Sequence, residues 1–350
     1  MDLFDYFTEY DAKDIISFSK AHFPCFGLLS RLLVADASFL TLREKFLFLQ
    51  YLSDSSASFD SEQQFFDFVQ SLTVDSISFC VKRVFKRFSW NGSDALKKVK
   101  ISAKILENFK IQYTCFDDSD FPAMLREMKD PPFMLFYRGN LEILNKTCVS
   151  VVGTRRATVS ASRAATEFAK SACDSGFCVV SGLAFGIDAA AHKGALLSQN
   201  SATCAVLPSG IDTITPRSHT KLALKILESG GLIMSEYLPG TPSVQFRYVQ
   251  RNRIVASLSA TTVVVQAPCG SGAMITAGLA LDYNREVFFH NECFSAQATS
   301  INQFSELQWK KLIAQGKKVD YKLHNSPKSF VEDGALVISN FTDFKEKMYG

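Results

Sequence analysis

The sequence has 350 residues, 47% of them hydrophobic, so it is long enough for two packed domains and too apolar for a disordered chain. Its formal net charge of +3 is too small to indicate a nucleic-acid-binding protein by itself, so any basic surface must arise from local clustering. Residues 1–14 lack a basic segment followed by an apolar one, and no apolar run approaches about 18 residues. We therefore expect neither an export signal nor a membrane span.

Residues 1–110 are rich in phenylalanine at helical spacing, as in the segments 39–52 and 62–72. Aromatic residues at this spacing form a protein core more often than a surface that stacks nucleic-acid bases. We predict a small helical N-terminal domain over residues 1–110 and assign no chemistry to it.

From residue 111 the pattern changes to short strands and turns, and beyond residue 148 apolar strands alternate with amphipathic helices. The expected strands include 149–152, 177–182, 202–210, 231–237, 261–268 and 286–290. This alternation predicts an α/β domain over residues 111–320, with an extended Rossmann-like, doubly wound and mostly parallel sheet. Residues 321–350 are too few for a further core, so we predict a short C-terminal appendage.

The segment 148–156, CVSVVGTRR, is the first candidate for a ligand site. An apolar strand ends at Gly153 and is followed by Thr154, Arg155 and Arg156, after which residues 159–172 have helical spacing. A helix N-terminus offers unpaired N–H groups, a glycine lets a phosphate approach the backbone, and the guanidinium groups add positive charge. The segment therefore predicts a phosphate-binding site.

Glycines and small hydroxyl residues follow other predicted strands as well. These positions are Ser181, Gly182 and Gly186, then Ser209 and Gly210, and then Gly270, Ser271 and Gly272. Because the carboxyl ends of parallel strands meet at one edge of a sheet, we expect these loops to converge on a single groove. One such loop alone is weak evidence, since a glycine after a strand usually marks only a turn.

A basic segment, Arg251-Asn252-Arg253, precedes an apolar helical stretch, and residues 237–281 contain no acidic side chain. Arginines in the first turn of a helix oppose the usual preference for acids there, and a bound anion would offset this cost. The alternative is that an arginine of this segment forms an ion pair with Glu236 or Asp282.

Other combinations of reactive residues have structural explanations. Asp188 and His192 share one face of a predicted helix, but without a further ligand at suitable spacing we interpret them as structural rather than as catalytic or metal-binding. Ser181 lacks the GxSxG pattern of a hydrolase nucleophile. Cysteines such as Cys148, Cys178 and Cys204 lie in apolar runs and are expected to be reduced and buried. We expect no catalytic residue, metal or cofactor.

The ordered motifs resemble the DNA-processing protein A family (DprA, also called Smf). They are VVGTRRAT (151–158), SGLAFGIDAAAHKGAL (181–196), AVLPSGIDTITP (205–216), GGLIMSEY (230–237), RNRIVASLS (251–259) and SGAMITAGLAL (271–281). The resemblance implies a cytoplasmic single-stranded DNA-binding protein rather than an enzyme. It also implies that the protein protects incoming DNA during natural transformation, or competence, helps to load the RecA recombinase and works as a homodimer.

Carried over by position, the resemblance implies DNA-binding roles for three segments. The phosphate-binding loop falls on Gly153, Thr154 and Arg155 beside Arg156, the second loop on Ser181, Gly182 and Gly186, and the basic element on Arg251, Asn252 and Arg253. To these the convergence of strand ends adds Ser271 and Gly272. The sequence departs from the family pattern at Gln266, where a glutamate is usual, and after residue 290, where PG and GxN signatures are missing. We also expect no winged-helix C-terminal domain.

The alternative function is that of a nucleotide-handling Rossmann enzyme of the lysine-decarboxylase-like phosphoribohydrolase type. Such an enzyme needs an acid after its glycine-rich loop, whereas the first carboxylate after Gly270 is that of Asp282. A dinucleotide dehydrogenase fits less well, because GxGxxG is missing after the first strand of the alternating region.

Overall fold

The computed structural model describes residues 27–86 and 88–350, which fall into two compact units. The N-terminal unit contains the described residues up to Phe136 together with 209–212 and 235–242. The sheet unit contains residues 137–208, 213–234 and 243–350. This division lies at Phe136, whereas the sequence analysis placed the first boundary after residue 110.

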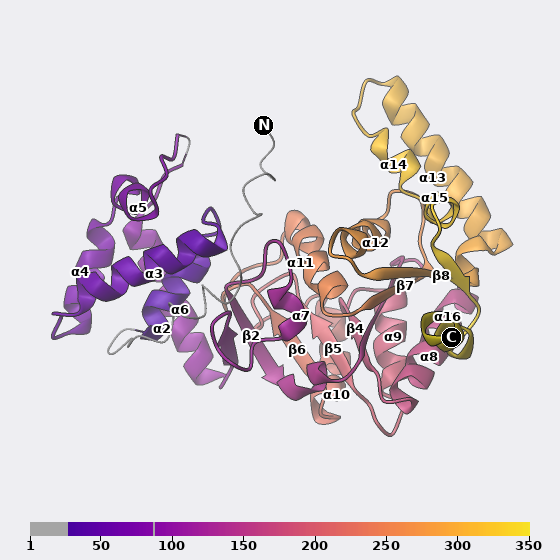
Figure 1. Ribbon diagram of the computed structural model, residues 1–350, viewed down its shortest axis with the longest axis horizontal. Helices are drawn as coiled ribbons and strands as arrows, with labels where there is room; N and C mark the ends of the chain where they lie inside the picture. Colours follow the sequence, from indigo (N-terminus) through magenta and orange to yellow (C-terminus); the bar gives the residue numbers. More distant parts are fainter. Residues whose placement is uncertain (1–26, 87) are drawn as a thin grey trace. The chain divides into compact units, whose positions relative to one another are not determined.

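The N-terminal unit is mostly helical, as predicted (Figure 1). Its helices are α2 (Gly27–Asp36), α3 (Leu42–Ser56), α4 (Glu62–Ser71), α5 (Val74–Val81), α6 (Gly92–Asn108) and α7 (Ala123–Arg126), and the chain also forms β1 (Gln112–Cys115) and β2 (Met134–Gly139). Thr41 begins α3 with a capping box that includes Glu44. Phe48 and Phe65 are at most 1% exposed. This burial supports the interpretation of the phenylalanines as core residues, although Phe79 is 84% exposed.

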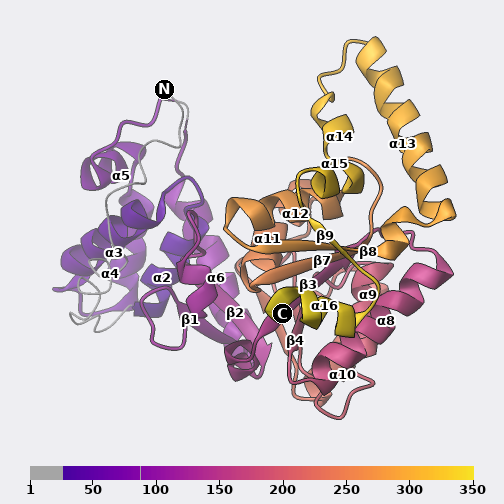
Figure 2. The same cartoon turned by 45° about the vertical axis from the view of Figure 1, so that its right-hand side comes forward.

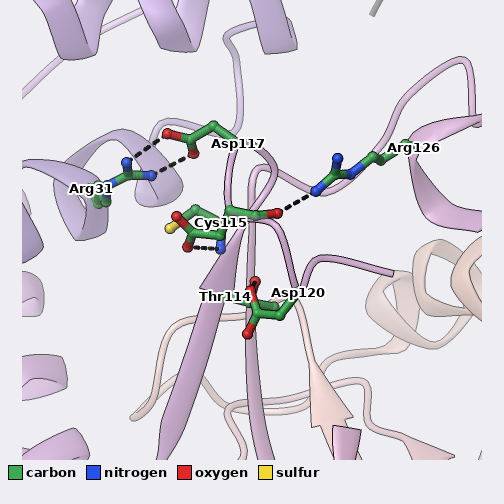
Figure 3. A network of polar contacts seen from close by, with 7 residues as sticks. Arg31, Thr114, Cys115, Asp117, Asp120 and Arg126 are labelled. Atoms are coloured by element: carbon green, nitrogen blue, oxygen red, sulfur yellow. Dashed lines mark hydrogen bonds and ion pairs between the residues drawn. The ribbon is translucent and has the colours of Figure 1, made fainter. Parts of the chain in front are cut away.

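A polar network joins α2 to the turn after β1 (Figure 3). Arg31 donates two hydrogen bonds of 2.7 Å to the two carboxylate oxygens of Asp117. Thr114 donates to Asp120 at 2.6 Å, and Arg126 donates to the carbonyl oxygen of Asp118. Residues 112–126 therefore pack with the helices, which is why the boundary lies later in the chain than expected.

Among the described residues the sheet has nine strands, in the order β1-β2-β6-β5-β4-β3-β7-β8-β9. In the sheet region after β2 these are β3 (Cys148–Gly153), β4 (Cys178–Ser181), β5 (Thr203–Val206), β6 (Leu232–Ser235), β7 (Thr261–Gln266), β8 (Glu286–His290) and β9 (Leu336–Ile338). Neighbouring strands from β6 to β9 pair in parallel. The chain extends from β3 to β6 on one side and returns to β7 on the other, so the predicted doubly wound topology is confirmed. The order reverses between β3 and β7, which is where such sheets form ligand crevices.

Helices cover both faces of the sheet (Figure 2). One face packs against α8 (Val159–Asp174), α9 (Ile187–Ala195) and α16 (Phe341–Tyr349). On the other face, Ser150 of β3 donates a 2.6 Å hydrogen bond to Val255 of α11 (Gln245–Ser257), which packs beside α12 (Gly272–Asp282). Helix α10 (Thr220–Glu228) lies between β5 and β6 in the chain.

The last residues of the chain complete the core of the sheet unit. Strand β9 pairs with β8, and the ring centroid of Phe344 lies 5.5 Å from that of Phe168 and 5.3 Å from that of Phe288. Phe344 is 1% exposed. Strand β9 and helix α16 therefore contribute residues to this core, whereas the sequence analysis expected a short appendage over residues 321–350.

The segment between β8 and β9, where the PG and GxN signatures are missing, is largely helical. It forms α13 (Ala296–Ala314), α14 (Tyr321–His324) and α15 (Pro327–Glu332), and α13 and α14 lie side by side (Figures 1 and 2). Ala298 is the buried residue of α13. In the described part of the chain no helix combines the length and the hydropathy needed to cross a bilayer.

Candidate nucleic-acid interface

A groove of about 750 Å³ opens in the sheet unit where β3, β4 and β7 end. We call it the sheet-edge groove. Its walls come from the loops after these three strands, from most of the length of α11 and from the first turns of α12. The charged side chains among its described lining residues are those of Arg155, Arg156, Arg251 and Asp188. The groove is therefore basic although the whole chain is nearly neutral.

The loop after β3 is held in one conformation by its contacts. Thr154 donates its backbone N–H to the carbonyl oxygen of Gln266 at 2.7 Å, and its hydroxyl accepts from the N–H of Arg156 at 3.2 Å. A side chain at Gly153 would clash, because a Cβ there would lie 2.4 Å from Ile187 and 2.8 Å from the Gln266 carbonyl oxygen. These contacts fix the backbone of the loop in which Arg155 and Arg156 line the groove.

Arg155 and Arg156 are exposed at the groove. The guanidinium carbon of Arg155 lies 4.9 Å from the ring centroid of Tyr248 on α11, which restrains the side chain without neutralising it. Within the described residues, no carboxylate forms an ion pair with either arginine. Both charges thus remain available to an anion.

The N-terminus of α12 adds backbone donors to the same groove. Ser271 precedes the helix without a side-chain capping bond, and the first turn contains no acid. Ser271, Gly272 and Ala273 line the groove. The first N–H groups of a helix have no partner within it and carry a partial positive charge, so this end of α12 favours a phosphate beside the two arginines.

Arg251 supports the groove from below. It is 3% exposed, and its Nη1 donates to the carbonyl oxygens of Gly182, at 2.6 Å, and Val206. A Cβ at Gly182 would lie 2.2 Å from this Nη1, so the glycine makes room for the guanidinium. Arg251 therefore links α11 to the ends of β4 and β5. Because its side chain is buried, its charge contributes to the positive potential of the groove and not to an exposed contact with a ligand.

Asp188 and His192 form hydrogen bonds within the sheet unit that stabilise its local structure. One carboxylate oxygen of Asp188 accepts from the N–H groups of Gly182, at 3.2 Å, and Ala184, at 3.3 Å. Burial raises the pKa of Asp188, although the nearby Arg251 charge and these donors oppose the effect. Burial also lowers the pKa of His192 to about 3, and the Nδ1 of this neutral ring lies 2.8 Å from the Thr203 hydroxyl. Neither residue contacts a metal-binding cluster, and the described residues contain none.

The model of a family described as DNA recombination-mediator protein A matches residues 112–346. The chain belongs to this family. The resemblance to DprA/Smf proteins inferred from the motifs is therefore confirmed.

Several relatives of the DNA recombination-mediator protein A family are similar in sequence. Protein Smf of Borreliella burgdorferi is 35% identical over 196 residues, which cover 56% of this chain and 62% of that protein. Protein Smf of Escherichia coli K12 is 40% identical over 172 residues, which cover 49% of this chain and 46% of that protein. These matches thus span less than two thirds of either relative.

Two solved structures share the fold. The X-ray structure of DNA processing protein A (DprA) from Streptococcus pneumoniae has a TM-score of 0.61 and 25% identity, and the match covers 91% of this chain and 97% of that one. A structure of DNA processing protein A from Helicobacter pylori, described for its single-stranded DNA binding mode, has a TM-score of 0.52 and 26% identity, covering 68% and 95%.

The twelve residues predicted to bind DNA, ten from the family resemblance and two from the convergence of strand ends, separate into two groups. Nine of them line the groove, namely Gly153, Thr154, Arg155, Arg156, Gly182, Arg251, Asn252, Ser271 and Gly272. Three are not among its lining residues, namely Ser181, Gly186 and Arg253. Ser181 is fully buried and donates to the Val151 carbonyl oxygen at 2.7 Å, and Gly186 has a φ of 75° where its backbone packs against Thr154.

The groove also contains residues that the sequence analysis did not select for the site. Thr276 lies one turn after Gly272, and Val244 and Gln245 lie about one turn before Tyr248. Counting in steps of three or four residues from Asn252 and Gly272 along their helices would have indicated these positions.

Proposed function

We propose that this chain binds single-stranded DNA in the sheet-edge groove and acts as a DNA recombination mediator. The observation that carries the proposal is the position of Arg155 and Arg156. Both are exposed residues that line one groove together with the uncapped N-terminus of α12. Fixed cations next to backbone N–H donors match the oxygens of a phosphodiester.

A sugar–phosphate strand fits these groups better than a duplex does. Arginines and backbone N–H groups contact phosphates without reading sequence, so we expect weak sequence preference. Tyr248 lines the groove next to the Arg155 guanidinium, and its aromatic ring can stack on an unpaired base. The bases of a duplex are already stacked and cannot use that face.

The finer parts of the proposal come from the family. The Helicobacter pylori relative is described for its single-stranded DNA binding mode, and its structure shares this fold. We extend that property to this chain, with protection of incoming strands in natural transformation, loading of the RecA recombinase, assembly as a homodimer and a cytoplasmic location.

The alternative of a phosphoribohydrolase depends on a free carboxylate in the groove. Asp188 is the acidic residue among the described lining residues. Its Oδ2 is already engaged by the N–H groups of Gly182 and Ala184, which hold the loop after β4. We therefore favour binding over hydrolysis.

Fluorescence anisotropy with a labelled oligo(dT) strand and a duplex of equal length tests the proposal. We expect tighter binding of the single strand, with the logarithm of the binding constant falling by roughly 0.7 per phosphate contact for each tenfold rise in salt. Equal affinity for the duplex would reject the strand-specific function. Release of ribose phosphate from a nucleoside monophosphate would instead support the hydrolase.

A further inference from the structure

Phe185 is one of the exposed phenylalanines of the sheet unit. It lies in the loop between β4 and α9 and is 48% exposed, whereas Phe168, Phe288 and Phe289 are at most 2% exposed. A single exposed aromatic ring is ordinary at a protein surface, so a role for Phe185 depends on how its ring is held and on what it borders.

The ring of Phe185 is held in place from one side. Its centroid lies 4.8 Å from that of His219, with an interplanar angle of 66°. His219 is itself fixed to the same loop, because its Nδ1 lies 2.8 Å from the Leu183 carbonyl oxygen. The edge-to-face contact thus orients the Phe185 ring before any ligand arrives.

The loop backbone is also well defined. Leu183 has a φ of 57°, which is uncommon for a residue with a side chain, and Gly186 has a φ of 75°. The Asp188 carboxylate accepts the N–H of Ala184 and so holds the middle of the loop. Phe185 is therefore presented by a rigid turn rather than by a loose segment.

This turn borders the groove. Ala184, immediately before Phe185, lines the groove. Gly186, immediately after it, packs so closely on the phosphate loop that a Cβ there would lie 2.2 Å from the Thr154 carbonyl oxygen and 2.8 Å from Arg155 backbone atoms. Phe185 thus lies at the rim, next to the loop that carries Arg155.

We propose that Phe185, supported by His219, stacks a base of the strand whose phosphates occupy the sheet-edge groove. The inference rests on the proposed function and adds a stacking residue to it. Tyr248 lies against the Arg155 guanidinium on the α11 wall, whereas Phe185 belongs to the β4–α9 turn. The two rings come from different elements, so they would give the strand two separate stacking contacts.

An abasic strand separates base stacking from phosphate contact. We would measure binding of labelled oligo(dT) and of an abasic strand of the same length by wild type, Phe185→Ala, Phe185→Leu, Phe185→Tyr and Arg155→Ala. Since stacking depends on a ring, Phe185→Ala and Phe185→Leu should each weaken oligo(dT) binding roughly tenfold, while Phe185→Tyr keeps it. On the abasic strand the three Phe185 variants should bind as wild type does, whereas Arg155→Ala should weaken binding of both strands.

Phe185→Trp supplies a direct readout. Its fluorescence should be quenched by oligo(dT) and unchanged by the abasic strand, with wild type, which contains Trp90 and Trp309, as the background. His219→Ala should give a smaller loss than Phe185→Ala, because the ring remains but loses its support.

The outcomes distinguish the two proposals. Tight oligo(dT) binding by wild type with no loss in Phe185→Ala, or an equal loss on both strands, would overturn the stacking role and leave the proposed function intact. If wild type binds neither strand, both proposals fail.

Discussion

Arg251 donates a hydrogen bond of 2.6 Å from Nη1 to the carbonyl oxygen of Gly182, two residues that are far apart in the sequence and adjacent beneath the groove. The three nearest atoms to a Cβ at Gly182 all belong to this guanidinium. The contact therefore requires both a long cationic side chain on α11 and the absence of a side chain after β4.

Replacement of Arg251 by alanine should lower the free energy of unfolding by about 3–5 kcal/mol, because it leaves two buried carbonyl oxygens and the Asp188 carboxylate without their cation. Gly182→Ala should cost about 1–3 kcal/mol through the clash with the guanidinium. In the double variant the clash disappears, so the two losses should not add. Urea unfolding of wild type, the two single variants and the double variant measures these free energies. If the two losses simply add, the proposed contact between Arg251 and Gly182 is contradicted.

Arg155→Ala and Arg156→Ala should weaken single-strand binding by about 1–3 kcal/mol each while leaving the unfolding midpoint unchanged, because both side chains are exposed. Each variant should also reduce the salt slope by roughly 0.7. The matched control is Arg163→Ala on α8, whose guanidinium pairs with Glu167 outside the groove. An unchanged salt slope in both groove variants would show that these arginines do not contact phosphates.

The loop that leads into α12 depends on α13. Asn302 accepts the N–H of Cys269 at 2.8 Å, and the Trp309 indole donates to the Cys269 carbonyl oxygen at 3.1 Å. Asn302→Ala should lower stability by about 1 kcal/mol and weaken single-strand binding several-fold, because the α12 N-terminus loses its anchor. Gln303→Ala, an exposed neighbour, is the control. Faster hydrogen exchange at residues 269–272 in Asn302→Ala alone would identify the loop as the affected part, and unaltered exchange there would argue against the anchor.

His192 should make the protein less stable in mild acid. Its pKa falls to about 3 in the folded protein from an ordinary value near 6.5, because burial disfavours the charged ring. Between these values the unfolded chain binds a proton that the folded chain does not, so stability is unaffected above about pH 6.5 and decreases as the pH falls below it. At pH 5 this group alone should cost about 2 kcal/mol.

Urea unfolding at pH 7 and pH 5 checks this dependence. His192→Asn keeps a donor for the Thr203 hydroxyl and does not titrate, so its stability should change less between the two pH values than that of wild type. An identical change in both proteins would mean that His192 does not govern this pH range. His290, whose pKa burial also lowers, is present in both proteins and cancels in the comparison.

The alternation of strands and helices and the Gly153 turn with its two arginines were predictable from the sequence alone. Both depend on local features: the spacing of apolar residues, and a glycine followed by Thr154, Arg155 and Arg156 at the end of an apolar strand. The convergence of strand ends followed from the parallel topology.

Tertiary structure decided which predicted groups face the groove. Arg251 and Arg253 lie two residues apart on α11, so packing of that helix turns Arg251 toward Gly182 and leaves Arg253 outside the lining. In the same way, only long-range contacts show that Asp117 binds Arg31 and that Phe344 packs on Phe168. Helix rotation and strand pairing depend on partners distant in sequence, and a local pattern contains no information about those partners.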